Sequence, residues 1–463
     1  MPRTLACVSL LAGLLAGCAY WQAAPADPCA ALFKQLPVAT QAYRDAQYHR
    51  LPGFSGLRSD RVLAALGASA DSPEQRRQWL LYLAERDAEA SRIEIAQLPS
   101  TARLAWAGAP RQADLSACRT RQVDRLSADP EAFARAVEAA QVPDDYRDWA
   151  RTLGLYPLFK PILRQGIAAW QQAAALAAAP EDDAHWLGYQ PIPLATQPPP
   201  LMLHEDSLGL PQAQPQQLDA LFARHAPRLK IAQAGRSDRI GSPYYRPDGG
   251  RDFNPLQARL YQHSSWSQLN GRWHLQLIYQ FWFSQRPKPN VLDLYGGELD
   301  GLLWRVTLDR QGKALLYDSI HPCGCWHSFY LPADSPLHLR QNVGEEARLS
   351  QRLSVTGDSA PTLWLSAGEH RLQWVDARRS RYPTLLYQRG PLDQLRQLPH
   401  SHGQRSLYGK DGLVPGSERL ERWLLWPSGV VSPGAMRQWG RHATAFIGRA
   451  HFDDPHLLER YFQ

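Results

Sequence analysis

The sequence predicts an α+β protein in which an N-terminal helical bundle is followed by a mostly antiparallel β-sandwich-like domain. Residues 29–185 are rich in Ala, Leu, Arg, Glu and Gln, and apolar residues recur there at intervals of three and four, which is typical of helices. Residues 201–463 contain many short runs of alternating apolar and polar side chains, which is typical of strands. A proline-rich stretch at 186–200 separates the two parts and is expected to be an extended linker.

Composition agrees with a globular protein of more than one domain. The chain has 463 residues, of which 44% are hydrophobic and 21% charged, so it can bury a large core. The net charge is +7, but the basic residues are spread along the chain and form no cluster. We therefore expect no nucleic-acid partner.

The first 17 residues have the pattern of a secretion signal. Arg3 precedes a short apolar run, Leu5 to Leu15, that is too short for an ordinary membrane span. The run ends in Leu15-Ala16-Gly17-Cys18, which resembles the lipobox of bacterial lipoproteins. The resemblance implies cleavage before Cys18 and attachment of fatty acyl chains such as palmitate to this cysteine.

The same resemblance implies a location and a set of partners. Residues 18–28 would tether the folded protein to the membrane through its lipid anchor. Ala19, in place of the Asp that marks inner-membrane retention in enteric bacteria, favours the outer membrane of a Gram-negative-type bacterium, with the protein facing the periplasm. A polymer of the envelope or another envelope protein is then the expected partner.

Within the helical part, Asp71-Ser72-Pro73-Glu74 predicts a helix start, and Ile162 to Ala179 predicts a further helix. Cys29 and Cys118 are the only cysteines of residues 29–185. In an oxidising periplasm they are expected to form a disulfide, which would contribute roughly 4–5 kcal/mol because the loop it closes is long. The alternative is two buried free thiols.

The β-rich part is predicted from its alternation. Trp273 to Phe283 alternates between apolar and polar residues and predicts a half-buried strand. Further expected elements are read from turn residues and from apolar runs. These are a hairpin of 301–308 with 313–320, a hairpin of 362–366 with 371–376, a strand at 384–388, and helices at 216–224 and 455–462.

A loop after the strand at 313–320 concentrates soft ligands and nucleophiles. His321, Cys323, Cys325 and His327 occupy every second position there, and Pro322 makes a straight strand unfavourable. A bent loop can gather all four side chains around one metal ion, for which zinc or copper(I) is the expected cofactor.

Carboxylates near this loop would complete such a site. Asp300 and Asp318 are expected to orient the metal-bound imidazoles. His370, in contrast, lies at a predicted hairpin tip and is expected to be exposed.

Two other interpretations of the loop remain open. Cys323 and Cys325 can form a disulfide, either as a simple clasp or as a redox element, because a Cys-Gly-Cys ring is small and strained. Alternatively, one cysteine is a nucleophile that His321 or His327 activates. The Cys-Gly-Cys-Trp-His run resembles a signature of a group of bacterial envelope lipoproteins, and this resemblance implies no mechanism.

The sequence thus leads to two hypotheses about function. In the first, a lipid-anchored periplasmic protein carries a metal or thiol site with hydrolytic or redox activity. In the second, the protein is a non-enzymatic envelope module that binds a polymer or another protein, and the two cysteines form a clasp. The sequence leaves open whether the protein is an enzyme.

Overall fold

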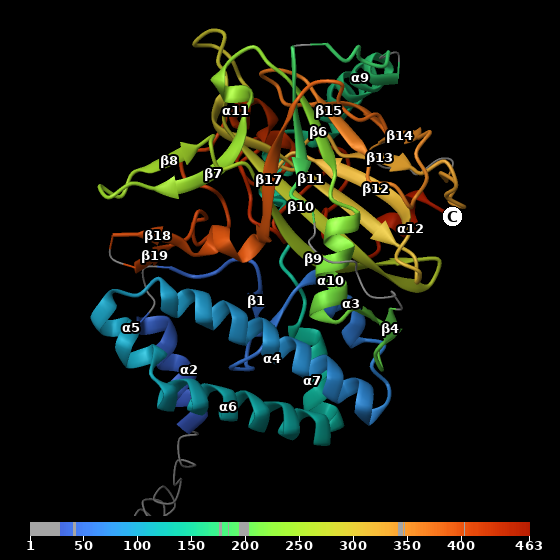
Figure 1. The fold of residues 1–463 in the computed structure, drawn as a ribbon. Coiled ribbons are helices and arrows are strands. Elements are labelled where there is room, and N and C mark those ends of the chain that lie inside the picture. The colour runs from blue at the N-terminus through green and yellow to red at the C-terminus, as the bar shows by residue number, and fades with distance from the viewer. Residues whose placement is uncertain are drawn as a thin grey trace, which may run out of the picture.

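The computed structural model describes residues 28–39, 43–175, 178–183, 185–193, 203–340, 346, 348–401 and 403–463. In these residues a layer of helices lies beneath one large sheet, and further helices cover the opposite end of the molecule (Figure 1). The predicted signal peptide and lipidated Cys18 fall outside the described residues. In the described part of the chain, no helix is long and apolar enough to cross a membrane.

The helices of the first part form the lower layer of Figure 1, apart from α8 and α9. Their bounds are α2 Pro28–Ala39, α3 Arg61–Gly67, α4 Pro73–Ala96, α5 Ser100–Ala107, α6 Ala109–Ala128, α7 Pro130–Ala139, α8 Asp148–Leu153 and α9 Tyr156–Ala175. The α4 helix begins where the sequence predicted, because Ser72 and Gln75 form a reciprocal capping box around Pro73. The second part adds α10 Pro215–Arg224, α11 Arg422–Leu425, α12 Leu457–Tyr461 and the 3-10 helices η1 Arg236–Asp238, η2 Leu392–Arg396 and η3 Trp426–Ser428.

Thirteen strands of the described residues form the main sheet. They are β3 Trp186–Pro191, β6 Arg228–Ala232, β7 Ile240–Tyr245, β8 Arg251–Asn254, β9 Arg259–Leu269, β10 Arg272–Arg286, β11 Gly297–Leu308, β12 Ala314–Ile320, β13 Ser328–Leu331, β14 Leu349–Arg352, β15 Thr362–Leu365, β16 Leu372–Asp376 and β17 Thr384–Pro391. Three small two-stranded sheets flank it: β1 His49–Arg50 with β2 Arg58–Ser59, β4 His204–Glu205 with β5 Pro211–Gln212, and β18 Leu398–His400 with β19 Gly403–Arg405.

The order of the main sheet is β14-β13-β12-β11-β10-β9-β17-β3-β6-β15-β16, and β7 and β8 branch from β10. Most neighbours are antiparallel, but β17 runs parallel to both β9 and β3. Because its first half pairs with β3 and its second half with β9, β17 joins two groups of strands into one sheet.

Both faces of the central strands are buried. Along β10, Leu275, Leu277 and Tyr279 enter one hydrophobic core, whereas Ile278 and Trp282 enter another core on the opposite face. The second face also holds buried polar side chains, which the C-terminal segment covers. For example, the guanidinium group of Arg305 donates to the backbone carbonyl of Phe452.

These observations correct the predicted fold. The α+β class is right, but the prediction of an N-terminal helical bundle followed by a β-sandwich-like domain is wrong. The main strands form one sheet rather than two facing sheets, and α9, which α8 contacts, lies at the end of the sheet far from α2–α7 (Figure 1). The polar positions of β10 suggested a solvent face, yet Gln276 and Gln280 are buried.

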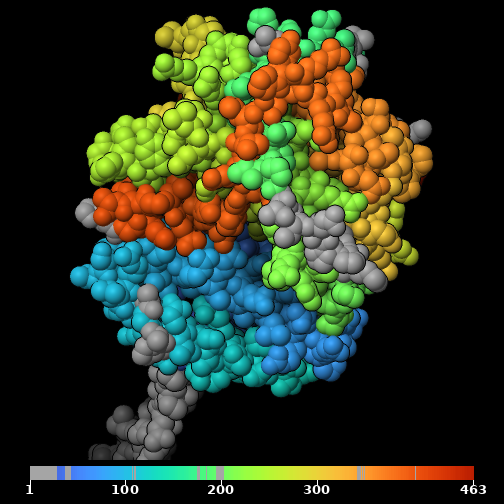
Figure 2. Space-filling model, in the orientation of Figure 1, coloured from blue at the N-terminus to red at the C-terminus, as the bar shows by residue number. Residues whose placement is uncertain are grey.

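The two predicted parts also pack closely against each other. The first residues of the expected linker at 186–200 form β3, a strand inside the main sheet. Arg396 of η2 is fully buried and pairs with Asp45 at 2.9 Å and with Glu89 of α4. Figure 2 shows the blue and cyan atoms of residues 43–140 directly beneath orange and green atoms of the second part.

One predicted covalent link is confirmed. Cys29 of α2 and Cys118 of α6 form a disulfide whose cysteines are 89 residues apart. Their Cα atoms are 5.4 Å apart, within the ordinary range for a disulfide. The bond fastens α2 to the lower helical layer.

Candidate functional site

The Cys/His loop, residues 321–327, is a compact turn between β12 and β13. The backbone N–H of His321 donates to the carbonyl of Cys325 at 3.0 Å, and that of Gly324 donates to the carbonyl of His321 at 2.8 Å. Gly324 has φ +92° and lies against the carbonyl of Ala443, where a Cβ atom would clash. Only glycine both adopts this φ readily and leaves room for the carbonyl, so the turn requires glycine at position 324.

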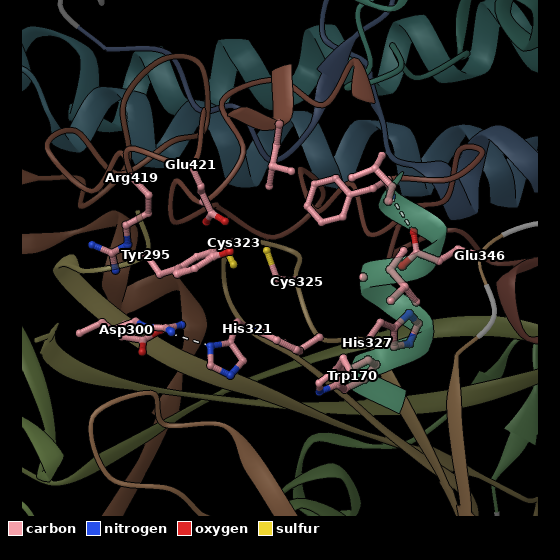
Figure 3. Close-up of a pocket in the computed structure, with 18 of the residues that line it drawn as sticks. Trp170, Tyr295, Asp300, His321, Cys323, Cys325, His327, Glu346, Arg419 and Glu421 are labelled. Carbon is pink, nitrogen blue, oxygen red and sulfur yellow. Dashed lines mark hydrogen bonds and ion pairs between the residues drawn. The ribbon is translucent and has the colours of Figure 1, made fainter. Parts of the chain in front are cut away.

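The loop lines a cavity of about 300 Å³ at the end of the sheet. Helix α9 forms one wall with Leu163, Ile167 and Trp170, and the rings of Trp170 and Trp326 meet edge to face at 5.0 Å. Figure 3 shows Tyr295 and Glu421 on the side of the two sulfur atoms, with Trp170 on the other side. The cavity therefore has a polar wall that carries the thiols and an apolar wall that belongs largely to α9.

The two histidines of the loop each contact one of the two carboxylates that the sequence analysis named. His321 Nδ1 is 3.3 Å from Asp300 Oδ1, and His327 Nε2 is 2.8 Å from Asp318 Oδ2. Asp318 is also held by Arg305, so it is a carboxylate acceptor and the Nε2 of His327 is the donor. Burial lowers the pKa of His327 to about 3, which keeps this imidazole neutral.

The metal site predicted from His321, Cys323, Cys325 and His327 is not assembled. All four residues line the cavity. However, in the described residues no three His, Cys, Asp or Glu side chains are grouped so that they can hold one ion. The two imidazoles lie apart (Figure 3), His321 beside Asp300 and His327 beside Asp318.

The two thiols instead lie near each other on one wall of the cavity (Figure 3). Cys323 and Cys325 are free cysteines, Cys323 is buried, and Cys325 is half-buried. Interaction with Cys323, together with burial, raises the pKa of Cys325 well above its ordinary value.

Charged groups from a distant part of the sequence surround the thiols. Glu421 lies within electrostatic reach of Cys325, and Arg437 of both cysteines. The Nε of Arg437 donates to the carbonyl of Cys323 at 3.0 Å, which fixes the guanidinium beside the loop. Arg419 is held by backbone carbonyls of β11 and also acts electrostatically on Cys323. Two guanidinium groups therefore lie close to the thiols.

Glu421 has an unusual protonation equilibrium. Burial raises the pKa of its carboxyl group to about 7, although Arg286, Arg419 and Arg437 oppose the shift. A carboxyl group with a pKa near neutrality can both accept and return a proton. Glu421 lines the same cavity as Cys325.

A buried chain of ionisable groups supports the opposite side of the loop. The His370 ring lies between Asp300, 2.8 Å from Nδ1, and Asp238, 3.2 Å from Nε2. Burial opposes the charged imidazole, but the hydrogen bonds to the two carboxylates outweigh it and raise the pKa of His370. The ring also stacks on Phe283 at 3.7 Å. The expectation that His370 is exposed is wrong, because its accessible surface is 0%.

The buried row of ionisable groups Asp238, His370 and Asp300 ends at the cavity. Hydrogen bonds from His321 and His370 lower the pKa of Asp300 despite its burial. Asp300 is therefore ionised and accepts from His321, whose Nε2 has no hydrogen-bond partner in the described protein. His321 is thus held by Asp300 on one side of its ring, and its other ring nitrogen is buried without a partner.

The residues that the sequence did not reveal come from segments remote from the loop. Arg419, Glu421 and Arg437 lie about a hundred residues further along the chain and belong to no motif. Only their packing against the loop shows their relation to the thiols. The chain matches no family model, no curated protein and no solved structure among known proteins.

Proposed function

We propose that the protein is a lipid-anchored cell-envelope protein that exchanges disulfides through Cys323 and Cys325. The observation that carries the proposal is the pair of free, neighbouring thiols at the wall of a cavity that is also lined by Glu421, a buried carboxyl group whose pKa is about 7. The lipobox that ends at Cys18 supports an oxidising envelope location, where such a pair can cycle between dithiol and disulfide.

In the proposed reaction, the thiolate of Cys323 attacks one sulfur of a substrate disulfide. A bond forms between the two sulfurs, the substrate disulfide breaks, and the released sulfur takes a proton. Cys325 then gives its proton to Glu421 and attacks Cys323, so that the second substrate sulfur leaves and is protonated. Two electrons pass to the substrate, which becomes a dithiol, and the protein retains a Cys323–Cys325 disulfide. The reverse sequence oxidises a substrate dithiol.

The geometry favours this activity over the other interpretations of the loop. A metal site with four ligands would need both imidazoles, and in the described residues these are not gathered with the thiols around one point. A disulfide clasp without chemistry would need neither the cavity nor Glu421. The groups that act on the thiols are Glu421, Arg419 and Arg437, so proton transfer by the carboxyl group is favoured over activation by a histidine.

The test is a single turnover with oxidised glutathione. Reduced full-length protein is mixed with this disulfide, quenched with acid, and analysed by intact mass. The native protein should lose two hydrogens, whereas Cys325→Ser should accumulate a glutathione adduct on Cys323, because the resolving thiol is missing. Cys323→Ser should form neither product. An adduct that forms equally well on Cys325 in Cys323→Ser, or no reaction of the native protein, would contradict the proposal.

A further inference from the structure

An exposed apolar surface surrounds the entrance of the cavity. It is built from α8, α9 and the segment that contains α11 and η3, and η3 contacts both α8 and α9. Leu158 is 72% exposed, Ile162 65% and Trp423 68%. We name this surface the apolar mouth, and its members are Trp149, Leu153, Leu155, Leu158, Ile162, Leu420, Trp423, Leu424 and Trp426.

The apolar mouth continues into the cavity. Ile162 belongs to both, and Leu163 and Ile167 of the same helix line the interior together with Leu425 of α11. In α9, no residue whose burial the structure describes is fully buried, although most of the helix is apolar. A helix of this composition normally packs its apolar side against other parts of the protein. Single exposed apolar residues are common on protein surfaces, but a continuous apolar surface like this one is not.

The side of the mouth that α8 and α9 form is basic. Residues 147–175 contain four basic side chains and one acid, Asp148, which is paired with Arg449. Lys160 and Arg164 of α9 form no ion pair with any described residue. A partner with acidic residues would therefore complement this surface.

We propose that the apolar mouth binds an extended polypeptide that combines apolar with acidic residues and carries the disulfide that the cavity receives. The part about the disulfide rests on the proposed function, whereas the binding of polypeptide does not. A small disulfide would fit within the cavity and leave the mouth uncovered. A polypeptide places its cysteine beside Cys323 and its neighbouring residues on α9 and Trp423.

The position of the mouth favours a polypeptide over a membrane surface. Helix α2, which starts ten residues after the predicted lipidated Cys18, and helix α9 lie at opposite ends of the molecule (Figure 1). A ten-residue tether spans at most about 35 Å. An anchored molecule would then direct the mouth away from its own membrane and toward the periplasm, where unfolded or oxidised polypeptides are the available substrates.

Binding can be measured without thiol chemistry. The probe is a fluorescein-labelled twelve-residue peptide of Leu, Phe and Glu with one internal disulfide, titrated into full-length Cys323→Ser/Cys325→Ser protein. Adding Leu158→Ser and Trp423→Ser to this protein should raise the Kd about tenfold or more, because each side chain loses buried apolar contact. Leu256→Ser is the matched control: Leu256 is 86% exposed but lies outside the mouth, and the Kd should not change.

The charge of the partner is tested with the same protein. Lys160→Glu combined with Arg164→Glu should weaken binding of the Glu peptide and strengthen binding of a peptide in which Lys replaces Glu. Equal Kd values for the mouth variant and for Leu256→Ser would overturn the proposal. The proposal would also be overturned if the protein bound phosphatidylglycerol vesicles but not the peptide. A dimer seen in sedimentation that Leu158→Ser dissociates would overturn it as well.

The two proposals fail separately. If the peptide binds the serine variant but the native protein does not exchange disulfides, the proposed reaction falls and the polypeptide site stands. If the native protein exchanges glutathione disulfide but the peptide does not bind, the exchange activity stands and the mouth is not its docking surface.

Discussion

The ionisation of Glu421 should affect how the stability of the whole protein depends on pH. In the folded chain its carboxyl group has a pKa of about 7, because burial disfavours the charged form. In the unfolded chain it has the ordinary glutamate value of 4.5. The folded state therefore binds this proton more tightly, and stability falls as the pH rises through the window between these two values.

The size of the effect follows from the shift. Each pKa unit corresponds to about 1.36 kcal/mol, so a shift from 4.5 to about 7 removes about 3 kcal/mol of unfolding free energy between pH 4.5 and pH 8. Glu421→Gln has no proton to lose. We expect its unfolding free energy to fall by about 3 kcal/mol less than that of the native protein over the same interval.

The assay is urea unfolding followed by tryptophan fluorescence at pH 4.5, 6 and 8. Comparing the two proteins at each pH cancels the contribution of all other ionisable groups. Glu298→Gln is the control for loss of a glutamate elsewhere, because Glu298 is largely exposed and pairs with Arg251 on the surface. Parallel stability curves for native protein and Glu421→Gln would show that Glu421 ionises normally and does not serve as the proton acceptor.

Three further predictions concern other parts of the chain. Cys18→Ala should abolish incorporation of a palmitate analogue and release the protein from membranes, and unchanged labelling would contradict the lipoprotein assignment. His370→Ala should lower the unfolding free energy by roughly 3–5 kcal/mol in urea titrations, because two buried carboxylates lose their shared partner; a loss below about 1 kcal/mol would contradict the ion network. Cys29→Ser should lower it by roughly 2–5 kcal/mol, and a non-reduced digest of the native protein should yield the peptides of Cys29 and Cys118 joined.

Local elements were predictable because their signals are local. The capping residues before α4, the alternation along β10 and the turn between β11 and β12 each involve a few neighbouring residues, and the structure has these elements where they were expected. The Cys29–Cys118 disulfide was predictable from the number of cysteines in the first part and the expected compartment.

The arrangement of the sheet was not predictable in the same way. Gln276 and Gln280 alternate with apolar residues as they would on a solvent face, but here the C-terminal segment covers them. The parallel pairing of β17 with β3 joins residues almost two hundred positions apart. Neither feature leaves a local pattern, so a sandwich was expected where one sheet with two covered faces occurs.

In the site, too, local features were predictable from the sequence and long-range features were not. The alternation of His321, Cys323, Cys325 and His327 singled out a loop that lines the cavity, and the two nearby aspartates do contact the two histidines. The metal expected from this alternation assumed that all four side chains converge. The tight turn at Gly324 and the separate carboxylates direct them differently, and the acid beside the thiols, Glu421, comes from a segment without a motif.

The most direct test of the central claim is the redox equilibrium of the two cysteines. Full-length protein is equilibrated in glutathione buffers of stepped potential, alkylated in acid and analysed by peptide mass, with zinc and copper measured in the same samples. We predict that Cys323 and Cys325 become protected together as one two-electron couple, without stoichiometric metal. Independent modification of the two cysteines, or a native protein that holds one zinc or copper ion with both thiols reduced, would contradict disulfide exchange at this site.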